Sequence, residues 1–347
     1  MQVNAKELNE CIRKVYIPNK TSNSILGSLL MESVDGKLVL SSTNLDIKNR
    51  LETNINWSST IAIDKKAIDV ISKVGDQEIE IEEEDTTLII KFDNSTFKTA
   101  TIDTTDLIGM VKVDTTIDAT EINSSQLLKA ISKASGYVAT DDTRYVFNGL
   151  YLSNGIVAAT DGRRLLRYKT NIELSNSCII PYEAIPTIKS ILENSDTIKL
   201  SIGETLQITD GKFTMQTKLI DGNYPDIENV IPKEAPTKFT ISKDKIKSSL
   251  NIALGIAETP SRQLIFEGKY GKLTMSCKDS SGSLYSVELG DTQEEFKLAL
   301  KGDYFKDAII SMDDNEISVK FFTPNSPCKF GDVEHIDIVV MPMKISD

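Results

Sequence analysis

The sequence repeats its own layout about every 119 residues, and this repeat limits the possible folds more than any other feature. Val3, Ile122 and Ile241 lie 119 residues apart, and each ends a short apolar stretch. Asn or Ser follows each of them, and then a segment with helical periodicity begins. An Asn or Ser oxygen at such a point can accept a hydrogen bond from a backbone N–H of the first helical turn. We therefore predict that each repeat begins with a strand end and a capped helix.

A second set of similar segments lies midway between the first three, at residues 63–68, 180–185 and 300–305. Asp64 and Asp303 suit helix starts, and Pro181 suits a first helical position. The half-repeat is therefore about 60 residues long, and the chain holds six of them. The predicted helices cover residues 4–16, 64–74, 123–135, 181–193, 242–254 and 301–311.

Alternating apolar runs between these helices predict short strands. Examples are KLVLSS at 37–42, TLIIKF at 87–92, KLTMSC at 272–277 and EISVKF at 316–321. Turn pairs such as Asp35-Gly36, Asn154-Gly155 and Asp210-Gly211 separate the runs. Asp161-Gly162 in the stretch ATDGRRL is a further hairpin signal. The unit is one helix with several antiparallel strands, so we expect three α+β domains at residues 1–118, 119–236 and 237–347.

Composition excludes several classes of protein. No run of about 18 apolar residues is present that could span a membrane, and the first residues lack the apolar core of a signal peptide. The four cysteines, at positions 11, 178, 277 and 328, show no paired spacing. We expect reduced thiols in a cytoplasmic protein, with no disulfide framework, metal or cofactor.

The net charge of −12 disfavours nucleic-acid binding unless the basic residues are segregated. The six predicted helices carry 14 Lys and Arg against 9 Asp and Glu, which leaves −17 for the rest of the chain. Lys129 and Lys133 lie on the face opposite to Leu127 and Ile131. Two such lysines on one helix usually mark only a solvated face, but their recurrence on most of the six helices predicts a common basic surface for sequence-independent phosphate contact.

Four stretches, in this order, resemble the bacterial sliding clamp, the β subunit of DNA polymerase III. They are DTRYVFNG at 142–149, ATDGRRL at 159–165, LIDGNYPDIENVIP at 219–232 and VVMPMKI at 339–345. The resemblance implies that each domain has the DNA-clamp fold, with two helices and antiparallel sheets, and that the chain forms half of a closed ring. It further implies a head-to-tail homodimer around double-stranded DNA that tethers the replicative polymerase, the clamp loader and other proteins with clamp-binding motifs, without being an enzyme.

The resemblance also assigns a partner-peptide pocket by matching position. The pocket residues would be Phe147, Thr160, Gly162, Arg163, Arg164, Leu165, Pro225, Asn229, Val230, Tyr304, Val339, Met341, Pro342, Met343, Lys344 and Ile345. Methionines suit a shared docking site because they repack around different apolar side chains. Histidine is common in the family where Arg163 stands, and arginine where Asn229 stands, so motif preference can differ. Residues Lys20, Arg144 and Tyr145 match DNA-contacting positions, and the helical face adds Lys129 and Lys133.

Two other interpretations stay open at this point. An enzyme is one, but GxSxG, HExxH, P-loop and GxGxxG motifs are absent, and His335 is the only histidine. Ser242 and Lys245 match the SxxK spacing, yet Ser242 falls at a predicted helix cap. The acidic run from Glu80 to Asp85 is typical of an exposed hairpin rather than a metal site. The other interpretation is an α+β scaffold that binds proteins but not DNA.

Overall fold

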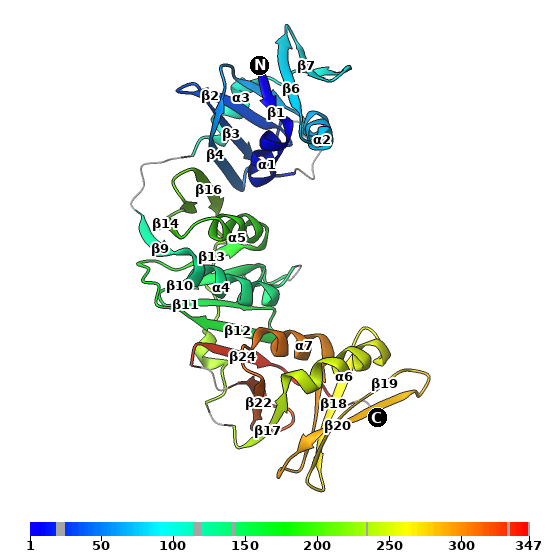
Figure 1. Ribbon diagram of the computed structural model, residues 1–347. Coiled ribbons are helices and arrows are strands. Elements are labelled where there is room, and N and C mark those ends of the chain that lie inside the picture. Colours follow the sequence, from blue (N-terminus) through cyan, green and yellow to red (C-terminus); the bar gives the residue numbers. More distant parts are fainter. Residues whose placement is uncertain (19–24, 114–118, 141–142, 234, 332–333, 346–347) are drawn as a thin grey trace. The chain divides into compact units, whose positions relative to one another are not determined.

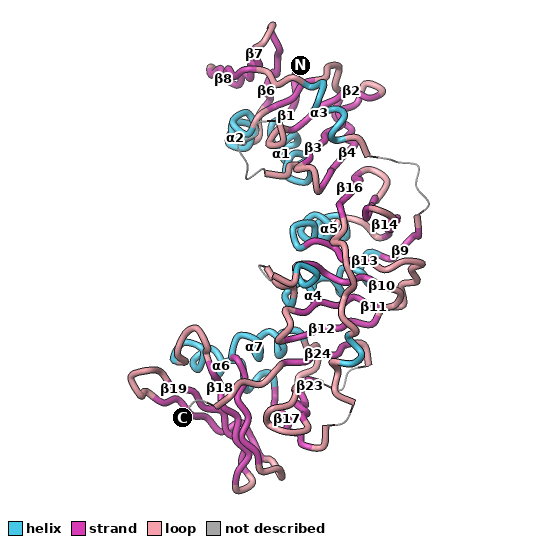
Figure 2. The backbone as a smooth tube through the Cα atoms, turned by 180° about the vertical axis from the view of Figure 1, so that it is seen from behind, coloured by secondary structure: helices cyan, strands magenta, loops and turns pink. Residues whose placement is uncertain are grey.

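The computed structural model describes residues 1–18, 25–113, 119–140, 143–233, 235–331 and 334–345. These form two compact units, residues 1–128 with 183–219 and residues 129–182 with 220–347. Each unit holds one eight-stranded and one four-stranded sheet, and every strand pair is antiparallel (Figures 1 and 2). Among the described helices, none has the length and apolar character needed to cross a membrane.

The first unit begins with a four-stranded sheet in the order β1-β6-β7-β8, and its eight-stranded sheet has the order β5-β2-β3-β4-β16-β15-β14-β9. The strands are β1 (Gln2–Asn4), β2 (Leu29–Val34), β3 (Lys37–Thr43), β4 (Ile47–Asn56), β5 (Ile61–Ile63), β6 (Glu78–Glu84), β7 (Thr87–Phe92), β8 (Ser95–Ala100), β9 (Thr120–Asn123), β14 (Thr197–Ile202), β15 (Thr205–Thr209) and β16 (Phe213–Lys218). The helices are α1 (Ala5–Val15), α2 (Lys65–Val74), α3 (Thr104–Val111) and α5 (Ile185–Glu193), and α4 (Ser124–Ala134) begins in this unit.

The second unit has an eight-stranded sheet in the order β13-β10-β11-β12-β24-β23-β22-β17 and a four-stranded sheet in the order β20-β19-β18-β21. The strands are β10 (Gly149–Ser153), β11 (Ile156–Thr160), β12 (Arg164–Lys169), β13 (Cys178–Pro181), β17 (Thr237–Ser242), β18 (Gln263–Lys269), β19 (Lys272–Lys278), β20 (Leu284–Asp291), β21 (Phe296–Lys301), β22 (Glu316–Phe321), β23 (Cys328–Phe330) and β24 (Ile336–Val340). The helices are α6 (Lys243–Ile256) and α7 (Gly302–Ser311), with short 3₁₀ turns η1 (Ser135–Tyr137), η2 (Tyr145–Phe147) and η4 (Ile227–Asn229).

Each eight-stranded sheet consists of two four-stranded halves joined through one antiparallel pair. The pairs are β4 with β16, where Leu51 faces Phe213, and β12 with β24, where Leu165 faces Val339. Each four-stranded sheet repeats the strand order of one such half, with β8 or β20 in the place of the joining strand. The repeat seen in the sequence is therefore also a repeat of sheet topology, and β8 and β20 end their sheets as edge strands.

Helix starts follow the predicted capping residues in three cases and depart from them in three. The side chains of Asn4, Asp64 and Asn123 accept hydrogen bonds from the first turns of α1, α2 and α4, as predicted. Ser242 precedes α6 but makes no capping bond, and the Asn315 side chain accepts from the backbone N–H of Asp244 instead, at 3.1 Å.

The other two departures concern the half-repeat helices. Pro181 does not start a helix; it is the last residue of β13, and α5 begins at Ile185 after the 3₁₀ turn at Tyr182–Ala184. The proline at the start of α5 is Pro186. Asp303 lies in the first turn of α7, and Lys301 occupies the position before the helix.

Helix α3 was not among the six predicted helices. The Asp103 side chain accepts from the backbone N–H of Thr105 at 2.8 Å, and the helix buries Leu107 and Val111 against Leu30 and Ala62. Leu30 faces Ser41 across the β2–β3 pair, and cross-strand partners share one face of a sheet. The next residue, Ser42, points to the other face and donates to the backbone carbonyl of Val15, at the end of α1, so α3 and α1 cover opposite faces.

The predicted strands and turns are present where the sequence placed them. The four quoted runs are in β3, β7, β19 and β22, and the four Gly-containing pairs lie in hairpin turns. The acidic run at 80–85 forms β6 and its turn, where Lys91 pairs with Glu80 and Glu82. All four cysteines are free thiols, and the described residues contain no cluster of side chains suited to a metal ion.

Candidate functional site

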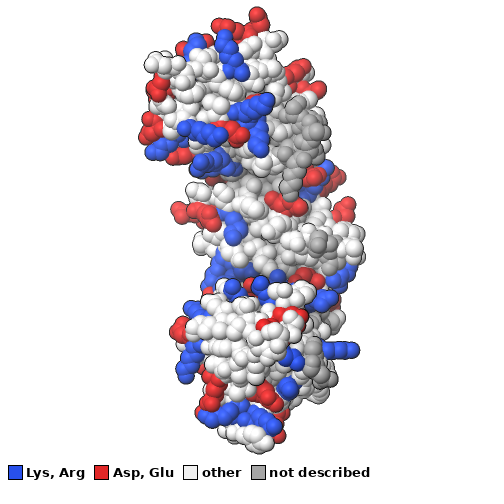
Figure 3. All heavy atoms as spheres, turned by 90° about the vertical axis from the view of Figure 1, so that its right-hand side faces the viewer, with Lys and Arg blue, Asp and Glu red and all other residues white. Residues whose placement is uncertain are grey.

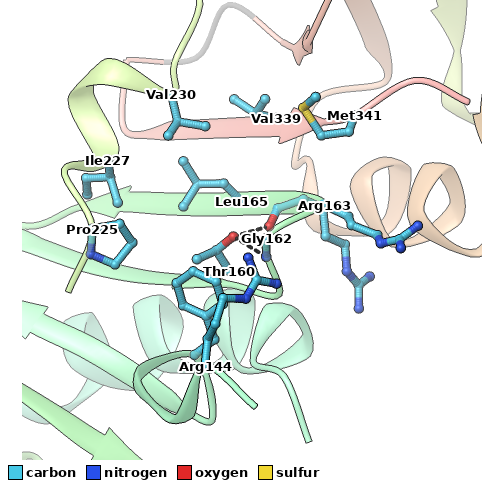
Figure 4. Close-up of a pocket in the computed structure, with 12 residues that line it drawn as sticks. Arg144, Thr160, Gly162, Arg163, Leu165, Pro225, Ile227, Val230, Val339 and Met341 are labelled. Carbon is cyan, nitrogen blue, oxygen red and sulfur yellow. Dashed lines mark hydrogen bonds between the residues drawn. The ribbon is translucent and has the colours of Figure 1, made fainter. Parts of the chain in front are cut away.

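An apolar pocket of about 220 Å³ opens on the second unit (Figure 4). The floor is formed by Leu165 of β12 and Val339 of β24, which face each other across the strand pair. Both belong to a buried cluster with Ala158, Ile227 and Ile231. The pocket therefore lies over the joint between the two halves of the eight-stranded sheet, and its floor is fixed by strand pairing rather than by a mobile loop.

The stretch ATDGRRL forms the tight turn between β11 and β12 beside this floor. The Thr160 hydroxyl accepts from the backbone N–H of Gly162 at 3.0 Å and donates to the carbonyl of Arg164 at 2.6 Å. The Asp161 carboxylate accepts from the backbone N–H groups of Arg163 and Arg164. Gly162 has a φ of +79°, and a Cβ there would lie 2.5 Å from a guanidinium nitrogen of Arg144. The turn thus requires glycine for its backbone angle, and a larger residue would also displace the Arg144 guanidinium.

Arg164 anchors the turn to the surrounding helices. Its guanidinium pairs with Asp161 and with Asp307 of α7, and it donates to the carbonyl of Gly136 at 2.8 Å. The same group lies 4.5 Å from the ring centroid of Tyr304 and 5.0 Å from that of Tyr137. With 12% of its side chain exposed, Arg164 is largely used in holding the site together.

An aromatic wall with one guanidinium closes another side of the pocket. Arg144 stacks over the ring of Phe147 at 4.5 Å. Phe147 meets Tyr224 edge-on, and Tyr224 stacks on Tyr151 with ring centroids 4.8 Å apart. Pro225 of the loop that follows β16 and Ile227 of η4 complete this wall. Figure 4 shows Arg144, Pro225 and Ile227 around the same cavity as Leu165 and Val339.

An ion network centred on the buried pair of Arg167 and Asp337 holds the η4 turn against the sheet. Arg167 of β12 pairs with Asp337, its cross-strand partner on β24, and with Glu228 of η4. Lys329 adds a contact to Asp337 at 2.8 Å. Burial favours the neutral form of Asp337, but hydrogen bonds from Lys329 and Arg167 outweigh it and hold the pKa of that carboxyl below its usual range.

The C-terminal stretch leaves the sheet at the pocket rim. The backbone N–H of Met341 donates to the carbonyl of Arg163 at 2.8 Å, and 39% of the Met341 residue is exposed. Two residues later, Met343 donates to the carbonyl of Ala299 in β21. Met341 is therefore an adjustable apolar side chain at the mouth of a rigid pocket.

Three family profiles match the chain and together cover most of it. The N-terminal, central and C-terminal domains of the DNA polymerase III beta subunit match residues 2–109, 121–226 and 228–345. The chain belongs to the DNA polymerase III beta subunit family, the bacterial sliding clamps.

Relatives agree with this assignment. The chain is 25% identical to the beta sliding clamp of Helicobacter pylori strain J99, over 94% of this chain and 92% of the relative. It is 24% identical to that of Chlamydia muridarum over 99% of both chains. Solved clamps from Bartonella birtlesii and Thermotoga maritima share its fold, with TM-scores of 0.90 and 0.87 at 19% and 22% identity, and each comparison covers 99% of both chains. Sliding clamps are non-catalytic processivity factors of DNA replication, so the chain is a clamp and not an enzyme.

The pocket of this clamp gathers ten of the sixteen residues that the resemblance assigned to it. They are Phe147, Thr160, Gly162, Arg163, Arg164, Leu165, Pro225, Val230, Val339 and Met341. The cavity wall does not include Asn229, Tyr304, Pro342, Met343, Lys344 and Ile345. Asn229 instead donates to Asp226 within its own turn, Tyr304 lies against Arg164, and Lys344 accepts at its carbonyl from Gln263. That these six residues take part in peptide binding remains a prediction.

Two residues of the pocket wall were not predicted from the sequence. Ile227 follows no apolar period that would mark it as buried, and Arg144 was assigned to DNA contact. The structure places Arg144 on the pocket wall, next to Tyr145, which is 58% exposed. Lys20, another predicted DNA contact, lies outside the described residues.

The predicted basic face of α4 is not a free solvated face. Asp313 pairs with both Lys129 and Lys133, and Lys133 also donates to the carbonyl of Ser311 at 2.5 Å. The hydrogen bond from Lys133 is the main cause that lowers the pKa of Asp313. Lys133 keeps only 16% of its side chain exposed, so it chiefly links α4 to the end of α7, whereas Lys129 is about half exposed.

Proposed function

We propose that the apolar pocket of this clamp binds short linear segments of its replication partners. The observation that carries the proposal is the joined floor of Leu165 and Val339 under the exposed Met341, since apolar side chains of a peptide would be buried there. Burying one bulky apolar side chain stabilises a complex by roughly 1.5–3 kcal/mol. Two such anchors with a few hydrogen bonds suit micromolar affinity, which lets several partners exchange at one site.

The charges around the mouth favour acidic or carboxylate-bearing peptides. Arg144 and Arg163 both line the cavity, and no Asp or Glu is among its lining residues. Arginine is suited to carboxylate groups because its planar donors can bind two oxygens at once. The arginine at position 163 therefore supports a preference for partners with an acidic group near the apolar anchors.

The test of the pocket is the double variant Leu165→Ala with Met341→Ala. We expect it to lose at least tenfold in affinity for a polymerase-derived peptide in fluorescence anisotropy, because two apolar contacts are truncated. The matched control is Val34→Ala, which shortens an exposed apolar side chain in the other unit. Equal affinity of the double variant and the wild type would mean that the peptide binds elsewhere.

We further propose that two chains form a ring by pairing β8 of one with β20 of the other. Both are edge strands, and both occupy the place that joins the halves of the eight-stranded sheets. A dimer would form this β8–β20 pair twice. Each pair would join two four-stranded sheets into one eight-stranded sheet, so neither β8 nor β20 would remain an unpaired edge. Light scattering at micromolar concentration should give about twice the 38.4 kDa chain mass. A monomer at every concentration, or a trimer, would refute this pairing.

For DNA contact we propose a sequence-independent basic surface that includes cations of α1 and α2. Arg13, Lys14, Lys65, Lys66 and Lys73 are exposed on these helices. Figure 3 shows Lys and Arg side chains interspersed with Asp and Glu side chains in the view that it draws. Lys20, Lys129, Lys133, Arg144 and Tyr145 remain candidates by resemblance and by helical position.

The number of phosphates contacted sets how steeply affinity falls with salt. We expect weak, salt-sensitive binding to duplex DNA that depends little on sequence. The charge reversals Lys65→Glu and Lys66→Glu should reduce both the affinity and its salt dependence. An unchanged salt dependence would exclude this surface.

A further inference from the structure

A second groove lies directly beside the peptide pocket. It has a volume of about 340 Å³ and lies between residues 228–233 and the turn that links β22 to β23. Val230 lines both cavities, so the groove begins where the pocket ends. All of its lining residues belong to the second unit.

The apolar part of this groove is solvent-exposed. Phe322 is 59% exposed and Val230 is 43% exposed, and Pro232 and Pro327 line the groove with them. An exposed aromatic ring beside prolines offers a large contact area with little freedom to lose on binding. Exposed apolar side chains that gather in this way are typical of interaction surfaces.

Both walls of the groove are held in place. On the β22–β23 turn, the Ser326 hydroxyl accepts from the backbone N–H groups of Phe322 and Thr323, at 3.1 and 2.8 Å, and donates to the Thr323 carbonyl. On the opposite wall, Glu228 is tied to Arg167. The groove is therefore formed before any partner arrives, which lowers the entropic cost of binding.

The groove offers one exposed cation to a partner. The lining residues include two charged side chains, Glu228 and Lys233. Glu228 is paired with Arg167, whereas Lys233 is exposed at the groove. A carboxylate brought alongside Phe322 would meet this lysine.

We propose that the groove binds the segment that flanks the apolar anchors of the same partner peptide. The occupant is an extended stretch that places one aromatic or large aliphatic side chain against Phe322 and Val230 and an acidic side chain near Lys233. The continuity of the two cavities through Val230 and the exposed Lys233 carry this choice. The inference rests on the proposed peptide pocket and adds a specificity site to it.

The experiment compares a short and a long form of one fluorescein-labelled, polymerase-derived peptide on the full-length protein. The short form carries only the apolar anchors, and the long forms add Asp-Gly-Phe-Gly at either end. We expect one of the long forms to bind about tenfold more tightly than the short form. In Phe322→Ala and in Lys233→Glu, this advantage should shrink to about twofold while the affinity of the short form stays unchanged.

The control variants separate this proposal from the pocket itself. Leu165→Ala with Met341→Ala should weaken the short form, which Phe322→Ala should not. If the short form binds but neither extension improves its affinity, or if both groove variants keep the full advantage, the groove proposal is wrong and the pocket stands. If the short form does not bind at all, both are wrong. A change of oligomeric mass in Phe322→Ala would assign the groove to a second copy of the chain and also refute the proposal.

Discussion

At the scale of single residues, the turn at the pocket depends on Gly162. An alanine there would have to adopt a φ of +79° with its Cβ 2.5 Å from Arg144. Strain of this kind costs about 1–3 kcal/mol. We expect Gly162→Ala to lower the free energy of unfolding by that amount and to weaken peptide binding, measured by urea unfolding and anisotropy. Gly203→Ala is the matched control, because its Cβ would meet no atom within 4 Å; equal effects of the two substitutions would contradict the account.

Asp337 gives the site a dependence on pH. Because its pKa is lower in the folded chain than the usual value of about 4, the carboxylate stabilises the fold above that value. This contribution should fall as the pH drops through the folded-state pKa. Asp337→Asn removes this charge from Lys329 and from Arg167, which keeps Glu228, and should lower the free energy of unfolding by roughly 1–3 kcal/mol at pH 7. In urea unfolding, the free energies of unfolding of the variant and the wild type should differ less at pH 3 than at pH 7. A difference in this free energy that does not change with pH would refute the ion network.

Residue by residue, the sequence could predict the pocket only through resemblance. Leu165 and Val339 lie far apart in the chain, and the apolar periodicity of the sequence does not predict that β12 pairs with β24. Arg144 shows the limit of position matching. The sequence shows only that Tyr145 follows it, and the three-dimensional structure shows its guanidinium stacked on Phe147 at the pocket wall.

At the scale of elements, α4 is tied to the end of α7 through Lys133. Replacing this lysine by glutamate removes the bonds to Ser311 and Asp313 and places two carboxylates together. We expect Lys133→Glu to lower the melting temperature, with a loss of about 1–3 kcal/mol in the free energy of unfolding. Lys129→Glu, which shares the partner Asp313 but is half exposed, should be less harmful. Equal melting temperatures of Lys133→Glu and wild type would show that the link is unimportant.

The predicted elements were those with strong local signals. Helices with a capping Asn or Asp and an apolar face were found within one or two residues of their ends, because their signals are local. Helix α3 was missed because it has only 8 residues, contains two threonines and a glycine, and gains its order from packing on the sheet. The helix start predicted at Pro181 is wrong because a proline also fits an edge strand such as β13.

At the scale of the whole molecule, the repeat predicts which edges associate. Leu284 lies at the start of the edge strand β20 and is 71% exposed. We expect Leu284→Asp to raise the dimer dissociation constant at least tenfold in analytical ultracentrifugation, because a charge would enter the new strand pair. Tyr270→Asp is the control, since Tyr270 lies in the β18–β19 turn and is 84% exposed. If both variants dimerise like the wild type, β20 is not the joining edge.

Retention on DNA shows whether this clamp encircles the duplex as a closed ring. The protein is loaded on nicked circular DNA with a clamp loader and ATP, separated from free protein by gel filtration, and counted before and after the circle is cut once. A ring that encircles DNA without gripping it stays on the circle in high salt and slides off the ends when the DNA is linearised. We predict that result. Retention on the linear DNA, or loss from the intact circle when salt is raised, would show that the protein holds DNA by surface contact and is not a sliding clamp.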